Sequence, residues 1–112
     1  MNETLRVITI ADVGLTKASI PSLSKSLRNK RFLTKIVLDG NIIGVEGAKV
    51  LAEGIKANET LTNLHVSHCL VLEEGAVAIA AALSNKKNLL VLDINNNKIG
   101  PNGCNAICKA IS

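Results

Sequence analysis

The chain repeats itself every 28 residues without slipping by a single position. The first residue of each copy is leucine, at Leu5, Leu33, Leu61 and Leu89. A repeat of this length is one small supersecondary unit that buries its apolar face only by stacking on its neighbours. The period therefore predicts an open solenoid, forming a single domain over residues 1–112. The predicted repeats are residues 5–32, 33–60, 61–88 and 89–112.

Two shorter periodicities alternate within each copy. Ile36 and Leu38 are spaced by two, which places both side chains on one face of a short strand. Residues 48–55 then carry small and aliphatic side chains at the i, i+3, i+4, i+7 spacing of an amphipathic helix. Successive strands must run parallel because the connection between them is too long for a hairpin. We therefore predict an α/β solenoid with four strand–helix repeats, a parallel sheet on the concave face and helices on the convex face.

The second copy carries a family resemblance. Its sequence from Leu33 to Ile55, LTKIVLDGNIIGVEGAKVLAEGI, resembles the leucine-rich repeats of the ribonuclease-inhibitor subtype. Ribonuclease inhibitor, NOD-like receptors and Ran GTPase-activating proteins share this subtype. The resemblance covers essentially the whole chain, and it implies a right-handed horseshoe segment that holds other proteins.

The resemblance also assigns a structural role to the turn that leaves each strand. The subtype has an Asn or Cys there that bonds backbone groups, and this chain has Asn41, Cys69 and Asn97. Val13 departs from the pattern, so we expect a looser first turn. Leu72 stands where Gly44 and Gly100 stand in other copies, and we expect it to change the conformation of its turn.

Composition places limits on the class of protein. The chain is 47% hydrophobic and 20% charged, which is typical of a globular domain rather than a disordered one. It has no apolar run of 18 residues and no charged start followed by an apolar stretch, so we expect neither a membrane span nor a secretory leader. Three cysteines at inward-facing repeat positions suit a reducing compartment, and we expect a cytoplasmic protein.

The residues that flank the buried strand positions are expected to form the concave face, which is polar and of mixed charge. Its footprint is on the order of 300 Å², against roughly 800 Å² per partner in a standard interface. We predict a noncatalytic scaffold that presents this face to a protein partner whose identity remains open. The predicted contact residues are Lys35, Val37, Asp39, Asn63, His65, Ser67, His68, Val91, Asp93, Asn95 and Asn96.

Catalytic, metal and cofactor sites are not predicted. Ser67 and His65 are two residues apart on one strand, about 6.6 Å, which is too far for a nucleophile and its base. The two histidines, with Asp39 or Asp93, have only weak metal-ligand spacing. Cys104 and Cys108 replace alanines of earlier copies and are interpreted as small core residues. The glycines are spread over separate repeats, unlike those of a phosphate-binding loop.

The sequence leaves two alternative functions open and disfavours a third, nucleic-acid binding. The net charge of +4 is concentrated around the first helix-to-strand loop, at Lys25, Arg28, Lys30, Arg31 and Lys35. Without aromatic residues to stack on bases, this charge does not predict nucleic-acid binding. A GTPase-activating or other enzyme-regulating role is the first alternative, with Asn95, Asn96 and Asn97 as candidates. Neither end carries a polar capping unit. We therefore expect a fragment of a longer array, or a short array that self-associates through its uncapped ends.

Overall fold

A computed structural model describes residues 6–11, 14, 19–28, 33–84, 86 and 88–111 of this chain. Strands and helices alternate along these residues. Their bounds are β1 (Val7–Thr9), α1 (Ser19–Arg28), β2 (Lys35–Val37), α2 (Gly44–Ala57), β3 (Asn63–His65), α3 (Leu72–Leu83), β4 (Val91–Asp93) and α4 (Gly100–Ile111). The predicted succession of four strand–helix units is confirmed.

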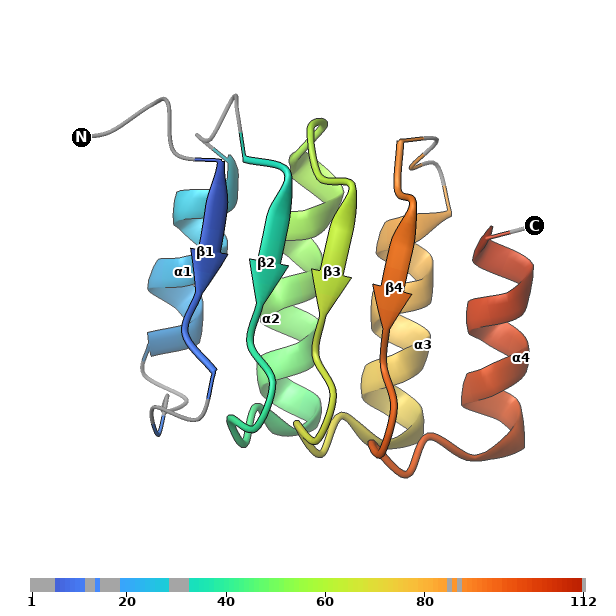
Figure 1. The fold of residues 1–112 in the computed structure, drawn as a ribbon. Helices are drawn as coiled ribbons and strands as arrows, with labels where there is room; N and C mark the ends of the chain where they lie inside the picture. Colours follow the sequence, from blue (N-terminus) through green and yellow to red (C-terminus); the bar gives the residue numbers. More distant parts are fainter. Residues whose placement is uncertain are drawn as a thin grey trace.

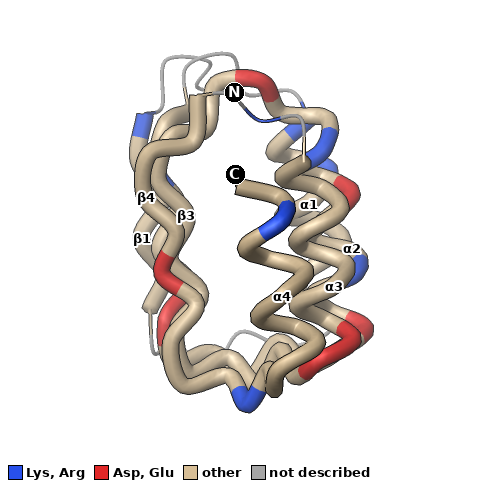
Figure 2. The backbone as a smooth tube through the Cα atoms, turned by 90° about the vertical axis from the view of Figure 1, so that its right-hand side faces the viewer, with Lys and Arg blue, Asp and Glu red and all other residues tan. Residues whose placement is uncertain are grey.

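The four strands form one parallel sheet in the order β1-β2-β3-β4. The helices form a second layer behind it, and each strand lies to the right of the one before while pointing down in the view of Figure 1. This arrangement makes the crossovers right-handed, as the twist of L-peptide strands favours. Figure 2 shows the two layers from the side, with the sheet and the helices well separated. The predicted open, right-handed α/β architecture is thus confirmed.

The strand register follows the sequence period. Paired residues in neighbouring strands are 28 positions apart, as in the row Ile8, Ile36, Leu64 and Leu92. Side chains alternate between the two faces of a strand, so this row points toward the helices. Ile36 and Leu64 are fully buried there. The shared interior therefore runs as one aliphatic layer between the sheet and the helices.

Neighbouring helices approach each other closely through small residues. A Cβ atom added at Gly75 would lie 3.0 Å from the Cβ of Ala48, and one added at Gly103 would lie 3.2 Å from the Cβ of Ala76. The alanines of one helix therefore face the glycines of the next. Cys104 occupies the position on α4 that Ala48 and Ala76 occupy on α2 and α3.

This packing corrects the interpretation of two cysteines. Cys104 and Cys108 are exposed, whereas the prediction placed them in the core. Their positions face the following helix in earlier repeats, and no helix follows α4 among the described residues. Cys69 is buried, as predicted.

The turns that leave the strands are held by the predicted Asn or Cys positions. The Asn41 Nδ2 donates to the carbonyl oxygen of Ile10 at 2.6 Å, and the Asn97 Nδ2 donates to that of Val66 at 2.7 Å. The Cys69 Sγ makes the equivalent contact with Leu38 at 3.3 Å. Each of these side chains therefore ties its turn to the preceding repeat. The looser turn expected at Val13 lies outside the described residues.

The expectation that Leu72 changes its turn is wrong. Leu72 has a φ of +61°, close to the +73° of Gly44 and the +67° of Gly100. The turn keeps its geometry because its hydrogen bonds persist, including the one from the Leu72 N–H to the carbonyl oxygen of Asn97 at 3.0 Å. The left-handed conformation of a leucine costs roughly 1–2 kcal/mol, which the surrounding repeat must offset.

None of the helices in the described ranges has the length and apolar character needed to cross a bilayer.

Candidate protein-binding face

The sheet face opposite the helices, which we call the open sheet face, is the surface predicted to be concave. Alternate strand residues point onto it because side chains alternate across a strand. Lys35, Val37, Asn63 and His65 are half-buried on this face, and Val91 is exposed. The open sheet face therefore carries partly buried side chains on the side of the sheet away from the aliphatic interior.

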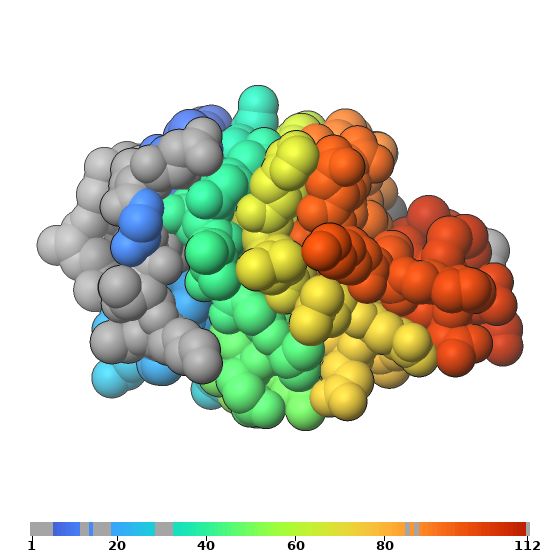
Figure 3. All heavy atoms as spheres, turned by 90° about the horizontal axis from the view of Figure 1, so that it is seen from below, coloured from blue at the N-terminus to red at the C-terminus, as the bar shows by residue number. Residues whose placement is uncertain are grey.

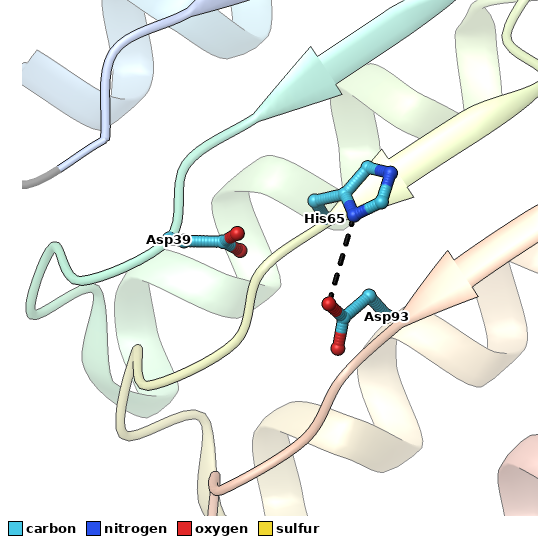
Figure 4. A group of neighbouring side chains, drawn as sticks. All are labelled: Asp39, His65 and Asp93. Carbon is cyan, nitrogen blue, oxygen red and sulfur yellow. Dashed lines mark ion pairs between the residues drawn. The ribbon is translucent and has the colours of Figure 1, made fainter.

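A three-residue cluster lies on the open sheet face. His65 ends β3, Asp93 ends β4, and the His65 Nδ1 lies 3.6 Å from the Asp93 Oδ2. Asp39 comes from the turn after β2, and its carboxylate points toward the other two side chains (Figure 4). One donor atom from each residue lies within 4.8 Å of the others. Three consecutive repeats thus contribute one polar group each to the same point.

The backbone of the turns orients both carboxylates. The Ser67 N–H donates to the Asp39 Oδ1 at 2.8 Å. The Asn95 N–H donates to the Asp93 Oδ1 at 3.2 Å. A carboxylate has about four lone-pair sites, so each one retains acceptor capacity after this bond. The cluster is therefore a pair of positioned carboxylates with a histidine between them.

The structure does not assemble a catalytic triad. The His65–Asp93 pair exists, as the strand pairing predicted. Ser67, however, is buried in the turn after β3, with 8% of its surface exposed. No hydrogen bond joins Ser67 to His65 in the described part of the chain, and Ser67 uses its N–H to hold Asp39. Ser67 therefore positions a carboxylate instead of presenting a nucleophile.

The predicted contact residues beyond the strands lie in the turns at the lower edge. His68, Asn95 and Asn96 are exposed there. Figure 3, seen from below, shows these turns lying beside one another from repeat to repeat. The Asn96 Nδ2 lies 3.2 Å from the His68 Nε2. His68 therefore pairs with the next repeat and does not join the cluster around His65.

Asn97 is not available to a partner. It is 1% exposed, and its amide donates to the carbonyl oxygens of Val66, Ile94 and Asn95. The three consecutive asparagines considered for enzyme regulation therefore include one that belongs to the interior.

Two basic side chains near the helix-to-strand loops have partners in the structure. Arg28 lies 3.9 Å from Glu53, while Lys30 and Arg31 fall outside the described residues. The Lys86 Nζ donates to the carbonyl oxygens of Lys56 at 2.7 Å and Asn58 at 2.6 Å. Lys86, which would have extended a basic stripe, thus joins its loop to the preceding repeat.

The sequence offers the two histidines with Asp39 or Asp93 as metal ligands of weak spacing, but it does not bring Asp39, His65 and Asp93 together in one cluster. When the repeats are aligned, Asp39 occupies the same position as Ser67 and Asn95, whereas His65 occupies the same position as Asp93. Asp39 and His65 therefore fall in different columns of the alignment. Residues on neighbouring strands that are displaced by two positions still lie within reach of each other across a sheet. A search along such diagonals would have found the contact.

Three comparisons with known proteins place the fold. The model of the family described as leucine-rich repeat matches residues 29–52, 57–80 and 85–108. Mouse NACHT, LRR and PYD domains-containing protein 14 is 32% identical over 111 residues, which are 98% of this chain and 11% of that protein. Pig ribonuclease inhibitor is 28% identical over 109 residues, which are 96% of this chain and 24% of the inhibitor. The chain therefore spans a quarter or less of the length of these relatives.

A solved structure agrees with the architecture. The tropomodulin C-terminal domain from Caenorhabditis elegans superposes with a TM-score of 0.56 at 13% sequence identity, covering 97% of this chain and 83% of that one. At this identity the similarity concerns the fold alone.

Proposed function

This chain belongs to the leucine-rich repeat family, of the ribonuclease-inhibitor-like type, and on that premise we propose that it is a noncatalytic module that binds a protein partner through its open sheet face. Pig ribonuclease inhibitor, by its name, inhibits another protein. The proposal assigns this chain the same general activity, the holding of a protein, and leaves the partner open.

The observation that carries the proposal is the charge arrangement on the open sheet face. Lys35 begins β2, two residues before Val37, which is the strand partner of His65, and Asp39, His65 and Asp93 form the cluster on the same face. The side chains of His65 and Asp93 are 22% and 30% exposed, so they are already partly desolvated. A partner that covers them must supply groups of complementary charge, because an unpaired charge in an interface is costly. Such a face selects its partner by charge as well as by shape.

The regular rows of strand residues on the open sheet face support a role in presenting polar groups to a partner. Lys35, Asn63 and Val91 form one row of paired strand residues, and Val37, His65 and Asp93 form the next. Because neighbouring strands lie about 4.8 Å apart, the polar groups within each row keep fixed positions relative to each other. A partner thus meets a preorganised surface, which lowers the entropy lost on binding.

A charge-swap experiment tests this proposal. We would immobilise the chain, capture proteins from a cell lysate, and compare the captured proteins by mass spectrometry for the parent and two double variants. The face variant is Lys35→Glu with Asp93→Lys. The control is Lys49→Glu with Glu53→Lys on the exposed surface of α2, where the side chains make only surface ion pairs at 3.9 Å. Both double variants keep the net charge of the parent.

We expect the face variant to lose a set of proteins that the helix variant retains, with the same melting temperature for both. Retention of the same proteins by the face variant, together with their loss from the helix variant, would show that the binding surface is the helical layer. Capture that none of the changes affects would contradict a charge-selective face altogether.

A further inference from the structure

We propose that Asp39, His65 and Asp93 form a binding site for a divalent transition-metal ion, with Zn²⁺ as the best match. The proposal is independent of whether the open sheet face binds a protein. Its basis is the convergence of three donor atoms, one from each of three consecutive repeats, within 4.8 Å of one another. Figure 4 shows the three side chains directed toward a common point.

The geometry suits a tetrahedral ion. Zinc bonds of about 2.1 Å at tetrahedral angles separate their donors by about 3.4 Å. The His65 Nδ1 and the Asp93 Oδ2 are 3.6 Å apart, which is close to this separation. The Asp39 carboxylate lies within 4.8 Å of both and must approach by about 1.4 Å at most, which rotation about its side-chain bonds can supply.

The donor set selects the kind of ion. Two carboxylates carry two negative charges, which balance a divalent cation, and the neutral imidazole supplies a nitrogen donor. Calcium and magnesium prefer ligand sets made of oxygen, whereas a mixture of imidazole and carboxylate suits zinc and its neighbours. Three protein ligands leave a fourth position for water, because the side chains are only partly buried.

The turns supply the outer contacts that a metal site needs. The Ser67 N–H holds Asp39 at 2.8 Å and the Asn95 N–H holds Asp93 at 3.2 Å. Hydrogen bonds of this kind orient ligating carboxylates and contribute to metal affinity. The ligands therefore need little further ordering when an ion binds.

The experiment is a calorimetric titration of the whole chain with zinc chloride at pH 7.5. Cys104 and Cys108 are both exposed and four residues apart on α4, so these thiols would bind zinc themselves. All proteins in the titration therefore carry Cys104→Ser and Cys108→Ser. The site variants are His65→Ala, Asp39→Asn and Asp93→Asn, and the matched control is His68→Ala, which removes the other imidazole.

We expect one zinc ion per chain, at least a tenfold loss of affinity in each site variant, and unchanged affinity in His68→Ala. The two Asn variants keep an oxygen that can accept the N–H of Ser67 or Asn95, so the turns remain held while one charge is lost.

Nuclear magnetic resonance of the unsubstituted His65 gives a second measurement that does not depend on the folding of a variant. Zinc should shift the ¹⁵N signal of its Nδ1 and leave the ring of His68 unchanged. Zinc binding that survives His65→Ala, a shift confined to His68, or the absence of saturable binding below millimolar zinc would each overturn the proposal.

Discussion

Replacing Asn97 with alanine should remove a large part of the stability of this chain. The Asn97 amide donates to the carbonyl oxygens of Val66 at 2.7 Å, Ile94 at 2.9 Å and Asn95 at 3.0 Å. Its Oδ1 accepts the N–H groups of Cys69 at 2.8 Å and Val71 at 3.2 Å. A single side chain thus joins the turn of its own repeat to the turn of the preceding one.

The cost follows from what the alanine variant leaves behind. Two backbone N–H groups lose their acceptor in a place where Asn97 itself is 1% exposed, and each buried group without a partner costs about 1–3 kcal/mol. We therefore expect the free energy of unfolding to fall by about 4 kcal/mol. Folded domains have only about 5–15 kcal/mol in total, so the loss approaches the whole stability of a domain at the lower end of this range.

Urea unfolding followed by circular dichroism measures this change. The matched control is Asn95→Ala in the same turn, where the side chain is exposed and the change should stay within about 0.5 kcal/mol. Asn97→Cys should fall between the two, because a thiol can donate to Val66 as Cys69 does to Leu38 but accepts poorly. A loss below about 1 kcal/mol in Asn97→Ala would refute the reasoning, since water would then replace the amide without penalty.

Two further predictions test the backbone. Lys98 is exposed with a φ of +52°, so Lys98→Gly should raise the free energy of unfolding by about 0.5–1 kcal/mol. Ile42 stands at the equivalent position without a positive φ, so Ile42→Gly should lower it. Thermal melting compares the two variants, and an equal effect of both would contradict the strain argument. Gly54→Ala should cost about 2 kcal/mol despite the better helix propensity of alanine, because the new Cβ would lie 2.6 Å from the Ser24 carbonyl oxygen. A Gly54→Ala protein as stable as the parent in urea would show that α1 can shift away from α2 without a loss of stability.

Most of the architecture could be predicted because one requirement is repeated four times. The row through Ile36 and Leu64 must face the helices in every copy, and a slip of one residue would turn it to solvent. The period therefore determines the strands, their parallel order and the side covered by helices. It also locates Asn41, Cys69 and Asn97, whose side chains bond the preceding repeat as the resemblance implied.

The errors arose where a residue depends on something outside its own repeat. Cys104 occupies an inward-facing position in the pattern, but the burial of that position comes from the following helix. Leu72 was expected to alter its turn because local propensity disfavours a positive φ, yet hydrogen bonds between repeats impose the same turn. Asp39 reaches His65 along a diagonal of the sheet, which an alignment of equivalent positions cannot display.

The interior and the open sheet face are joined through one residue in each turn. The Asn95 N–H donates to the Asp93 carboxylate on the face, while the Asn95 carbonyl oxygen accepts from the buried Asn97 amide. The preceding turn is held in a similar way, although its carboxylate comes from the preceding repeat: the Ser67 N–H donates to Asp39, and the Ser67 carbonyl oxygen accepts from the Cys69 thiol. Each of these peptide segments is therefore held from both sides, by a surface carboxylate and by a buried side chain. Because the buried Asn or Cys recurs every 28 residues, the interior fixes the turns whose N–H groups place the two carboxylates relative to His65.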